Sequence, residues 1–166
     1  MKKVLCVLVL LAAFVSSAFS ENITGFMGIS FDSSKDVAME EMKSRNWGAV
    51  MEYDDKVLFY NDRGSYFGCR AEKVELYFNN DRLAGGKIWF NADSAAKQDI
   101  KMAMNVINQL FEVRLTNSSK TDCSHNWHFE SANSNFVEYT DYDSDLFVVQ
   151  VGKKSGIGGP LAISLK

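Results

Sequence analysis

The sequence has 166 residues, of which 46% are hydrophobic and 13% aromatic, and it carries a net charge of −3 at pH 7. An acidic chain without a run of basic residues is a poor candidate for binding nucleic acid or an anionic membrane surface, so both classes of partner are excluded. The length is sufficient for one domain with its own hydrophobic core.

Residues 1–20 have the pattern of a cleavable signal peptide. Two lysines precede an apolar run, and the small residues Ala18 and Ser20 end it before Glu21. The run is shorter than the about 20 apolar residues that a membrane-spanning helix needs. We therefore expect an exported bacterial protein, periplasmic or secreted, whose mature part is 21–166 and is not inserted in a membrane. Cleavage removes two lysines, which leaves 16 basic residues against 21 acidic ones, a net charge of −5.

Two helices are predicted. In Ser33–Asp36 a capping hydroxyl precedes an acid by three residues, and an apolar stripe follows until Gly48, which we expect to end the helix. The second helix is predicted from Ser94 to about Glu112, because apolar residues recur there at spacings of three and four. Each helix has one apolar side and one polar side, which indicates that both lie on an apolar surface.

That surface is predicted to be an antiparallel sheet. Val74, Leu76 and Phe78 alternate with polar or aromatic residues, as do Ile88 and Phe90, and a polar turn between the two runs indicates a hairpin. Further strands are expected over 49–53, 57–60, 126–130, 135–140 and 146–151, and Thr116–Asp122 is expected to be a polar loop. The predicted fold class is α+β, with two helices packed on one face of an antiparallel sheet of about seven or eight strands.

The spacing of these elements suggests an internal repeat. Counting 61 residues forward moves Ser33 to Ser94 and the pair Ile88 and Phe90 onto Val149 and Val151. Two helix-plus-strands units, 28–90 and 91–151, would each expose an apolar sheet face and could share one continuous sheet. The helix stripes do not superpose well under the same offset, so duplication is a hypothesis.

The segment Gly28–Val37, followed by Met42 and Trp47-Gly48, resembles the opening of small exported bacterial α+β domains. The layout is similar to the tandem helix-plus-sheet repeats of the beta-lactamase-inhibitory protein family, and to the single unit of the small lipoproteins of outer-membrane assembly. Asp32 stands where such motifs commonly place glycine, and no lipidation cysteine begins the mature chain. The resemblance implies a non-catalytic binding role and transfers no functional residues.

Two cysteines remain after residue 20, Cys69 and Cys123. In an oxidising compartment, two such cysteines most often form one disulfide, and we predict this bond here. The alternative is two free buried thiols, because the geometry that decides the pairing is not visible in a sequence.

The sequence holds one cluster that could carry chemistry, Cys123-Ser-His125-Asn-Trp-His128. On a strand, Cys123 and His125 would share one face while His128 would take the other, so a metal site is not predicted. A hydrolase or thiol enzyme centred on these residues remains the alternative function. Asp141-x-Asp143-x-Asp145 begins like a calcium loop but lacks its later glycine and glutamate, which favours a hairpin turn. No cofactor is predicted.

The aromatic residues suggest a function. If side chains alternate, Tyr77 and Trp89 lie on the sheet face opposite Leu76 and Ile88, and that face is left open by the helices. An open sheet face with tyrosine and tryptophan is typical of protein-binding surfaces. We therefore predict a binding module that recognises a protein partner through Tyr77 and Trp89. A structural envelope protein without a discrete site is a further alternative.

Overall fold

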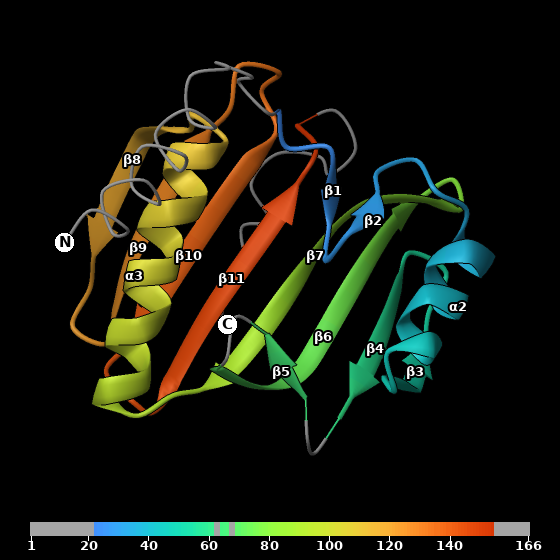
Figure 1. The fold of residues 1–166 in the computed structure, drawn as a ribbon, viewed down its shortest axis with the longest axis horizontal. Coiled ribbons are helices and arrows are strands. Elements are labelled where there is room, and N and C mark those ends of the chain that lie inside the picture. Colours follow the sequence, from blue (N-terminus) through green and yellow to red (C-terminus); the bar gives the residue numbers. More distant parts are fainter. Residues whose placement is uncertain (1–21, 62–63, 67–68, 155–166) are drawn as a thin grey trace, which may run out of the picture.

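The computed structural model describes residues 22–61, 64–66 and 69–154. In these ranges the chain forms two helices and a large antiparallel sheet, which confirms the predicted α+β class (Figure 1). No helix in this part of the chain is long and apolar enough to cross a membrane. The predicted signal peptide, 1–20, lies outside the described residues.

The main sheet has nine strands among the described residues. Eight of them follow the order β3 (Gly48–Glu52), β4 (Lys56–Tyr60), β6 (Cys69–Asn79), β7 (Arg82–Asn91), β11 (Leu146–Gly152), β10 (Phe136–Tyr142), β9 (Ser124–Glu130) and β8 (Arg114–Lys120). The ninth, β5 (Ser65–Tyr66), pairs with the start of β6. A separate two-stranded sheet consists of β1 (Gly25–Phe26) and β2 (Ile29–Ser30). All these pairings are antiparallel.

The main sheet consists of two similar halves, and each half follows one helix along the chain. Helix α2 (Lys35–Ser44) precedes β3, β4, β6 and β7, and helix α3 (Ser94–Leu110) precedes β8, β9, β10 and β11. The last strand of each set lies at the centre of the sheet, where β7 pairs with β11 (Figure 1). The two halves therefore have the same layout, while duplication of the sequence stays a prediction.

Helix α2 begins where the capping residues predict and ends earlier than expected. The N-cap is Ser34, whose side chain accepts a hydrogen bond from the Val37 amide. The helix ends at Ser44 because Asn46 adopts a left-handed backbone with φ of 62°, and the Trp47 amide then bonds back to the Met42 carbonyl. The prediction that Gly48 ends the helix is wrong, since that residue begins β3.

Helix α3 is capped by Asp93, whose side chain accepts hydrogen bonds from the amides of Ala95 and Ala96 at 3.1 and 2.9 Å. Its buried residues Ile100 and Met104 face the sheet. The helix ends before Glu112, which has a φ of 46°.

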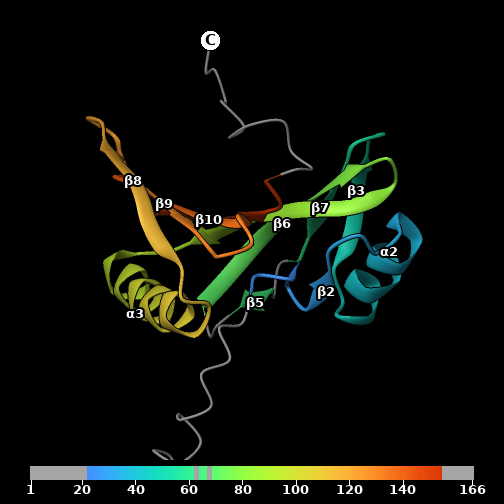
Figure 2. The same cartoon turned by 90° about the horizontal axis from the view of Figure 1, so that it is seen from above.

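The core lies between the helices and one side of the main sheet, which we call the helix-covered face. A buried apolar cluster joins Ala38 and Met42 of α2 and Ile100 and Met104 of α3 to strand residues that include Val57, Phe59, Val74, Leu76, Ile88, Phe90, Tyr139 and Phe147. Figure 2 shows both helices and β2 on this side of the sheet.

The pairing of β6 with β7 contains two bulges, each with one extra residue in one of the strands. Ala71 pairs with Phe90 and Lys73 with Trp89, which leaves Glu72 as an extra residue in β6. At the other end of the hairpin an extra residue in β7 lies between two ladder pairs. Between the bulges the pairing is regular, so odd-numbered residues from 73 to 77 and from 85 to 89 face away from the core.

One segment differs from its predicted structure. The expected loop over Thr116–Asp122 is wrong, because Arg114–Lys120 forms β8, the last strand at one edge of the sheet. All seven of its residues are exposed. A strand with no buried face needs no apolar alternation and is held by its backbone hydrogen bonds to β9.

Candidate functional site

The sheet face opposite the helices, which we call the open face, contains both predicted binding residues. Tyr77 and Trp89 are half-buried and lie on the side opposite Leu76 and Ile88. Figure 2 shows no described helix over this side, and it shows the outer strands β3 and β8 bent away from the helices. The open face is therefore concave.

A charged and polar row crosses the middle of the open face. Cross-strand pairing aligns Glu75 of β6 with Lys87 of β7, then Gln150 of β11, Glu138 of β10 and His128 of β9. Glu75, Lys87 and Gln150 are only 8%, 5% and 6% exposed, although no described helix covers them. Charged residues are seldom so buried, so this row is an uncommon feature.

Glu75 is fully engaged by its neighbours on β6. It forms an ion pair with Lys73 at 3.1 Å and accepts a hydrogen bond from the Tyr77 hydroxyl. Burial raises the pKa of the Glu75 carboxyl, but the hydrogen bonds from Tyr77 and Lys73 outweigh burial, so the pKa lies below its ordinary value. Burial and the bond to Glu75 raise the pKa of Tyr77. Tyr77 therefore donates a hydrogen bond to a buried carboxylate and also forms part of the surface of the open face.

Trp89 lies between two ammonium groups. The Lys73 nitrogen is 3.9 Å from the centroid of the indole ring and the Lys87 nitrogen is 5.6 Å from it, both within cation–π range. The indole nitrogen of Trp89 is buried and has no hydrogen-bond partner. These lysines fix the ring in place, while its N–H group remains unpaired.

Lys87 has no direct ionic partner among the described residues. Burial lowers the pKa of its amine, and the nearby charges of Glu75 and Glu138 oppose this effect. Glu75 is paired with Lys73, and Glu138 lies 3.9 Å from the Nδ1 atom of His128. The charge of Lys87 is therefore balanced by these carboxylates only at a distance.

The far end of the row is built around His128. Its ring stacks on Phe136 with centroids 5.3 Å apart, and its Nε2 atom lies 3.5 Å from Glu130. These contacts are on the open face, as the pairing of His128 with Glu138 requires.

A hollow of about 330 Å³ adjoins Trp89 at the edge of this row. The residues that line it are Tyr60, Glu72, Lys73, Trp89, Phe90, Asn91, Asp145 and Leu146. A group from a partner can therefore approach the indole from this end.

The predicted chemical cluster does not come together. His125 contacts the Trp127 ring and its Nε2 atom lies 3.2 Å from the Ser118 hydroxyl, while His128 is on the open face. Among the described residues, the side-chain sulfur of Cys123 has a polar contact with Thr121 and none with a histidine. Nor do three histidine, cysteine, aspartate or glutamate side chains in the described ranges lie close enough to hold a metal ion.

The structure also bears on the predicted disulfide and on the turn that contains Asp141. Cys123 is exposed and carries a free thiol. The predicted disulfide to Cys69 is not seen, and the side chain of Cys69 lies outside what the structure describes. Asp141 pairs with Lys97 and Lys101 of α3 at 2.9 and 2.6 Å, so its carboxylate is engaged by the helix.

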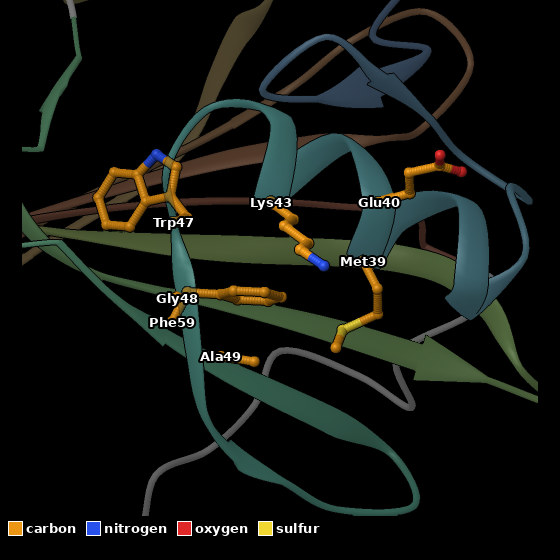
Figure 3. Close-up of a pocket in the computed structure, with 7 residues that line it drawn as sticks. All are labelled: Met39, Glu40, Lys43, Trp47, Gly48, Ala49 and Phe59. Carbon is orange, nitrogen blue, oxygen red and sulfur yellow. The ribbon is translucent and has the colours of Figure 1, made fainter.

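A second hollow, of about 470 Å³, lies between α2 and the β3–β4 hairpin (Figure 3). Its lining consists of Met39, Glu40, Lys43, Trp47, Gly48, Ala49 and Phe59. Figure 3 shows Met39 and Lys43 extending from α2 toward the hairpin, whereas Glu40 points the other way. The lining is mostly apolar and contains no set of polar groups that would orient a ligand.

Sequence reasoning placed Tyr77 and Trp89 on the open face but did not single out Glu75, Lys87 and Gln150 as parts of the candidate site. Alternation alone assigns these three to a solvated face, where a charge or an amide needs no explanation. The sequence offered one indication of their burial: alternation puts these residues on the same sheet face as large aromatic side chains of neighbouring strands.

Comparison of the chain with models of protein families, with curated proteins and with solved structures gives no match. The geometry of the open face therefore carries the functional interpretation.

Proposed function

We propose that this chain is an exported, non-catalytic binding module that recognises a protein partner through the open face, with Tyr77 and Trp89 at the centre of contact. The proposal includes export through the predicted signal peptide and a periplasmic or secreted location.

One observation carries the proposal: the open face holds a buried polar layer that no described helix covers. Gln150 and Trp89 each present a buried nitrogen without a hydrogen-bond partner there. Buried polar atoms are nearly always paired in folded proteins, so a polar layer with unpaired nitrogens on this face departs from what stability alone favours.

The shape and composition of the open face favour a protein over a small molecule. Small molecules are usually bound in enclosed pockets, whereas this face is a broad concave sheet surface. Tryptophan and tyrosine are the residues that most often dominate protein–protein binding energy. The mixture of lysines and glutamates around them favours a partner with complementary charges.

The test captures a partner and compares its affinity for the wild type with its affinity for matched variants. The chain without residues 1–20 serves as bait in an extract of the source organism, and the affinity of the captured protein is then measured by calorimetry. Trp89→Ser removes a central aromatic residue, and Thr140→Arg adds bulk to the same face without removing an internal contact. The control is Met102→Ser, which changes an exposed apolar residue of α3.

We expect each open-face variant to weaken binding by tenfold or more, which corresponds to about 1.4 kcal/mol or more. The control should bind within about twofold of the wild type, a difference of less than about 0.5 kcal/mol. Circular dichroism confirms that every variant is folded. If Thr140→Arg binds as tightly as the wild type, the open face is not the binding surface.

The alternative of a hydrolase or thiol enzyme has no observation in its favour. Such a mechanism needs a thiolate beside a histidine base, and the described contacts of Cys123 include no histidine.

A further inference from the structure

Among the described strands, the main sheet ends at β3 on one side and at β8 on the other. An edge strand presents backbone N–H and C=O groups that have no partner, and these can pair with a further strand. All seven residues of β8 are exposed, and Arg114 and Lys120 at its ends disfavour such pairing. β3 has one charged residue, Glu52, which is paired with Lys35 of α2 at 2.9 Å. The β3 edge is therefore the more open of the two to another strand.

Helix α2 lies beside β3 and runs along it in the opposite direction. At the start of the helix, the Lys35 ammonium donates a hydrogen bond to the Tyr53 carbonyl at 2.9 Å, just after β3 ends. After the helix, the chain turns over residues 45–47 and begins β3 at Gly48. The hollow of about 470 Å³ between α2 and the β3–β4 hairpin therefore adjoins the free edge of the sheet (Figure 3).

The hollow exists because the residues of β3 that border it are small. Ala49 pairs with Phe59 of β4, which is buried on the helix-covered face, so both side chains point to that side. Gly48 has no side chain, and a Cβ atom there would meet only the Tyr60 carbonyl oxygen, at 3.8 Å. Gly48 and Ala49 are exposed, whereas Phe59 and Trp47 are buried. The hollow thus has an apolar floor and is open at the edge of the strand.

Lys43 supplies a positive charge at the rim of the hollow. Its side chain is exposed and extends from α2 toward the hairpin (Figure 3). No ion pair in the described ranges involves Lys43, whereas Lys35 of the same helix is paired with Glu52. Glu40 also lines the hollow but points the other way. The ammonium of Lys43 is therefore accessible to a carboxylate from another molecule.

We propose that the β3 edge and this hollow form a second interaction site, which binds an extended segment of a partner protein as an added strand. One apolar side chain of the segment enters the hollow, and one acidic side chain pairs with Lys43. This site is separate from the open face, so the inference goes beyond the proposed function and does not rest on it.

The direction of the elements gives the order of the two residues in the segment. All described strand pairs are antiparallel, and an added strand of this kind runs from Glu52 toward Gly48. Lys43 is nearer than Met39 to the Gly48 end of the hollow, because α2 and β3 run in opposite directions. Side chains two residues apart on a strand point to the same side. The acidic residue therefore follows the apolar residue by two positions.

An extended peptide fits this site better than a small molecule does. The lining of the hollow has few polar groups to orient a small ligand, whereas the backbone of β3 orients a strand. A bulge between Ala49 and Met51 limits the number of backbone bonds, so the side chain in the hollow supplies part of the affinity. The residue between the apolar and acidic ones points to the other side of the sheet, where Met51 is 51% exposed.

The test uses three peptides that differ at one position each. The first is fluorescein-Thr-Thr-Leu-Thr-Glu-Thr-amide, in which leucine precedes glutamate by two residues. Serine replaces the leucine in the second peptide, and glutamine replaces the glutamate in the third. Fluorescence anisotropy measures their affinities for the chain without residues 1–20. Amide signals of the ¹⁵N-labelled chain locate the contact.

We expect the first peptide to bind saturably with a Kd below about 1 mM and to shift the amide signals of Gly48–Glu52. The serine peptide should bind about tenfold more weakly, because it has no apolar side chain to bury. Ala49→Phe, which fills the hollow, should weaken the first peptide by about tenfold for the same reason. Lys43→Met should weaken the first peptide by about threefold and leave the glutamine peptide unchanged.

Each variant has a matched control. Ala49→Ser keeps the hollow open, and Lys120→Met removes an exposed lysine from the opposite edge of the sheet. Both should bind the first peptide within about twofold of the wild type. Circular dichroism and thermal unfolding confirm that every variant is folded.

Four results would overturn the inference: no saturable binding up to about 1 mM, equal binding of the leucine and serine peptides, unchanged binding by Ala49→Phe, or amide shifts confined to other strands. The comparison of the two peptides and the position of the shifts decide the question even if Ala49→Phe does not fold. If Lys43→Met weakens the glutamate and glutamine peptides equally, the pairing of Lys43 with the acidic residue is wrong.

Discussion

The two faces of the β6–β7 hairpin both contain nearly buried residues but are built in opposite ways. On the helix-covered face, Leu76 and Ile88 are 0% and 1% exposed and pack against apolar residues. On the open face, Glu75 and Lys87 are nearly as buried, yet no described helix lies over them. In the same layer, Tyr77 bonds to Glu75 and the Lys87 nitrogen lies 5.6 Å from the centroid of the Trp89 ring.

This difference separates two roles within one sheet. Apolar burial on the helix-covered face stabilises the fold, because each buried side chain leaves water without a lost hydrogen bond. Burial on the open face has a free-energy cost, because charges and amides lose water and are only partly paired.

The largest expected effect compares two leucines on opposite faces. We expect Leu76→Ala to lower the free energy of unfolding by about 3 kcal/mol, because it leaves a cavity beneath the helices. Leu58→Ala, on the open face of β4, should cost about 1 kcal/mol, because Leu58 is only half-buried. Urea unfolding measures both. Equal losses would show that the two faces contribute alike to stability.

The second effect concerns the charge of Glu75. We expect Glu75→Gln to lower stability by about 2 kcal/mol, because Lys73 and Lys87 are then left without their nearest countercharge. Glu138→Gln, at a more exposed position of the same row, should cost less than about 1 kcal/mol. If Glu75→Gln leaves the free energy of unfolding unchanged, the ion pair of Glu75 does no more than offset the cost of removing its carboxylate from water.

The third effect is the response to acid. Hydrogen bonds hold the pKa of Glu75 below its ordinary value of 4.5, and Lys101 and Lys97 hold that of Asp141 below 3.8, in each case against burial. A lowered pKa means that the unfolded chain binds the proton more tightly, so stability is lost as pH falls through the folded-state value. The loss from protonating Glu75 cannot exceed the cost of Glu75→Gln at neutral pH.

Denaturation at pH values from 6 to about 2.5 measures this response. We expect Glu75→Gln and Asp141→Asn each to make the curve flatter below the ordinary pKa of the residue replaced. The two substitutions lie on opposite faces and share no contact, so their effects should add. An unchanged curve in Glu75→Gln would show that this carboxylate is not held by its neighbours.

The smallest expected effect is at Asp32, which has a φ of 66° and pairs with Lys153 at 2.7 Å. Asp32→Gly relieves the left-handed backbone but removes an exposed ion pair, so we expect a net change within about 0.5 kcal/mol. Asp32→Asn removes the charge and keeps a residue that tolerates this conformation less well than glycine. If Asp32→Asn is the more stable variant, backbone strain at this position is negligible.

Patterns of side-chain polarity predicted the parts of the fold that are local. The alternation from Lys73 to Phe90 gave the hairpin and the assignment of Tyr77 and Trp89 to one face, and the capping residues gave the start of α2. The exposed strand β8 was not predictable from alternation, because neither of its faces is buried. The end of α2 depends on the left-handed backbone of Asn46, which composition indicates only weakly.

The candidate site was predictable only in part for a different reason. The row from Glu75 to His128 crosses two groups of consecutive strands, β6–β7 and β9–β11, and the groups are joined only where β7 pairs with β11. No local pattern specifies that pairing. The burial of Lys87 and Gln150 follows from it, so this burial becomes visible only once the sheet is assembled.

The position of β11 affects how the chain reaches its native state. This strand is the last one described along the sequence, yet it lies between β7 and β10. During synthesis, the first five strands of the main sheet form with the edge of β7 unpaired until residues 146–152 have emerged. Contacts between distant parts of a chain form slowly, and an unpaired strand edge can associate with other chains in the meantime. We therefore expect the β7 edge to be the one most open to association until β11 pairs with it.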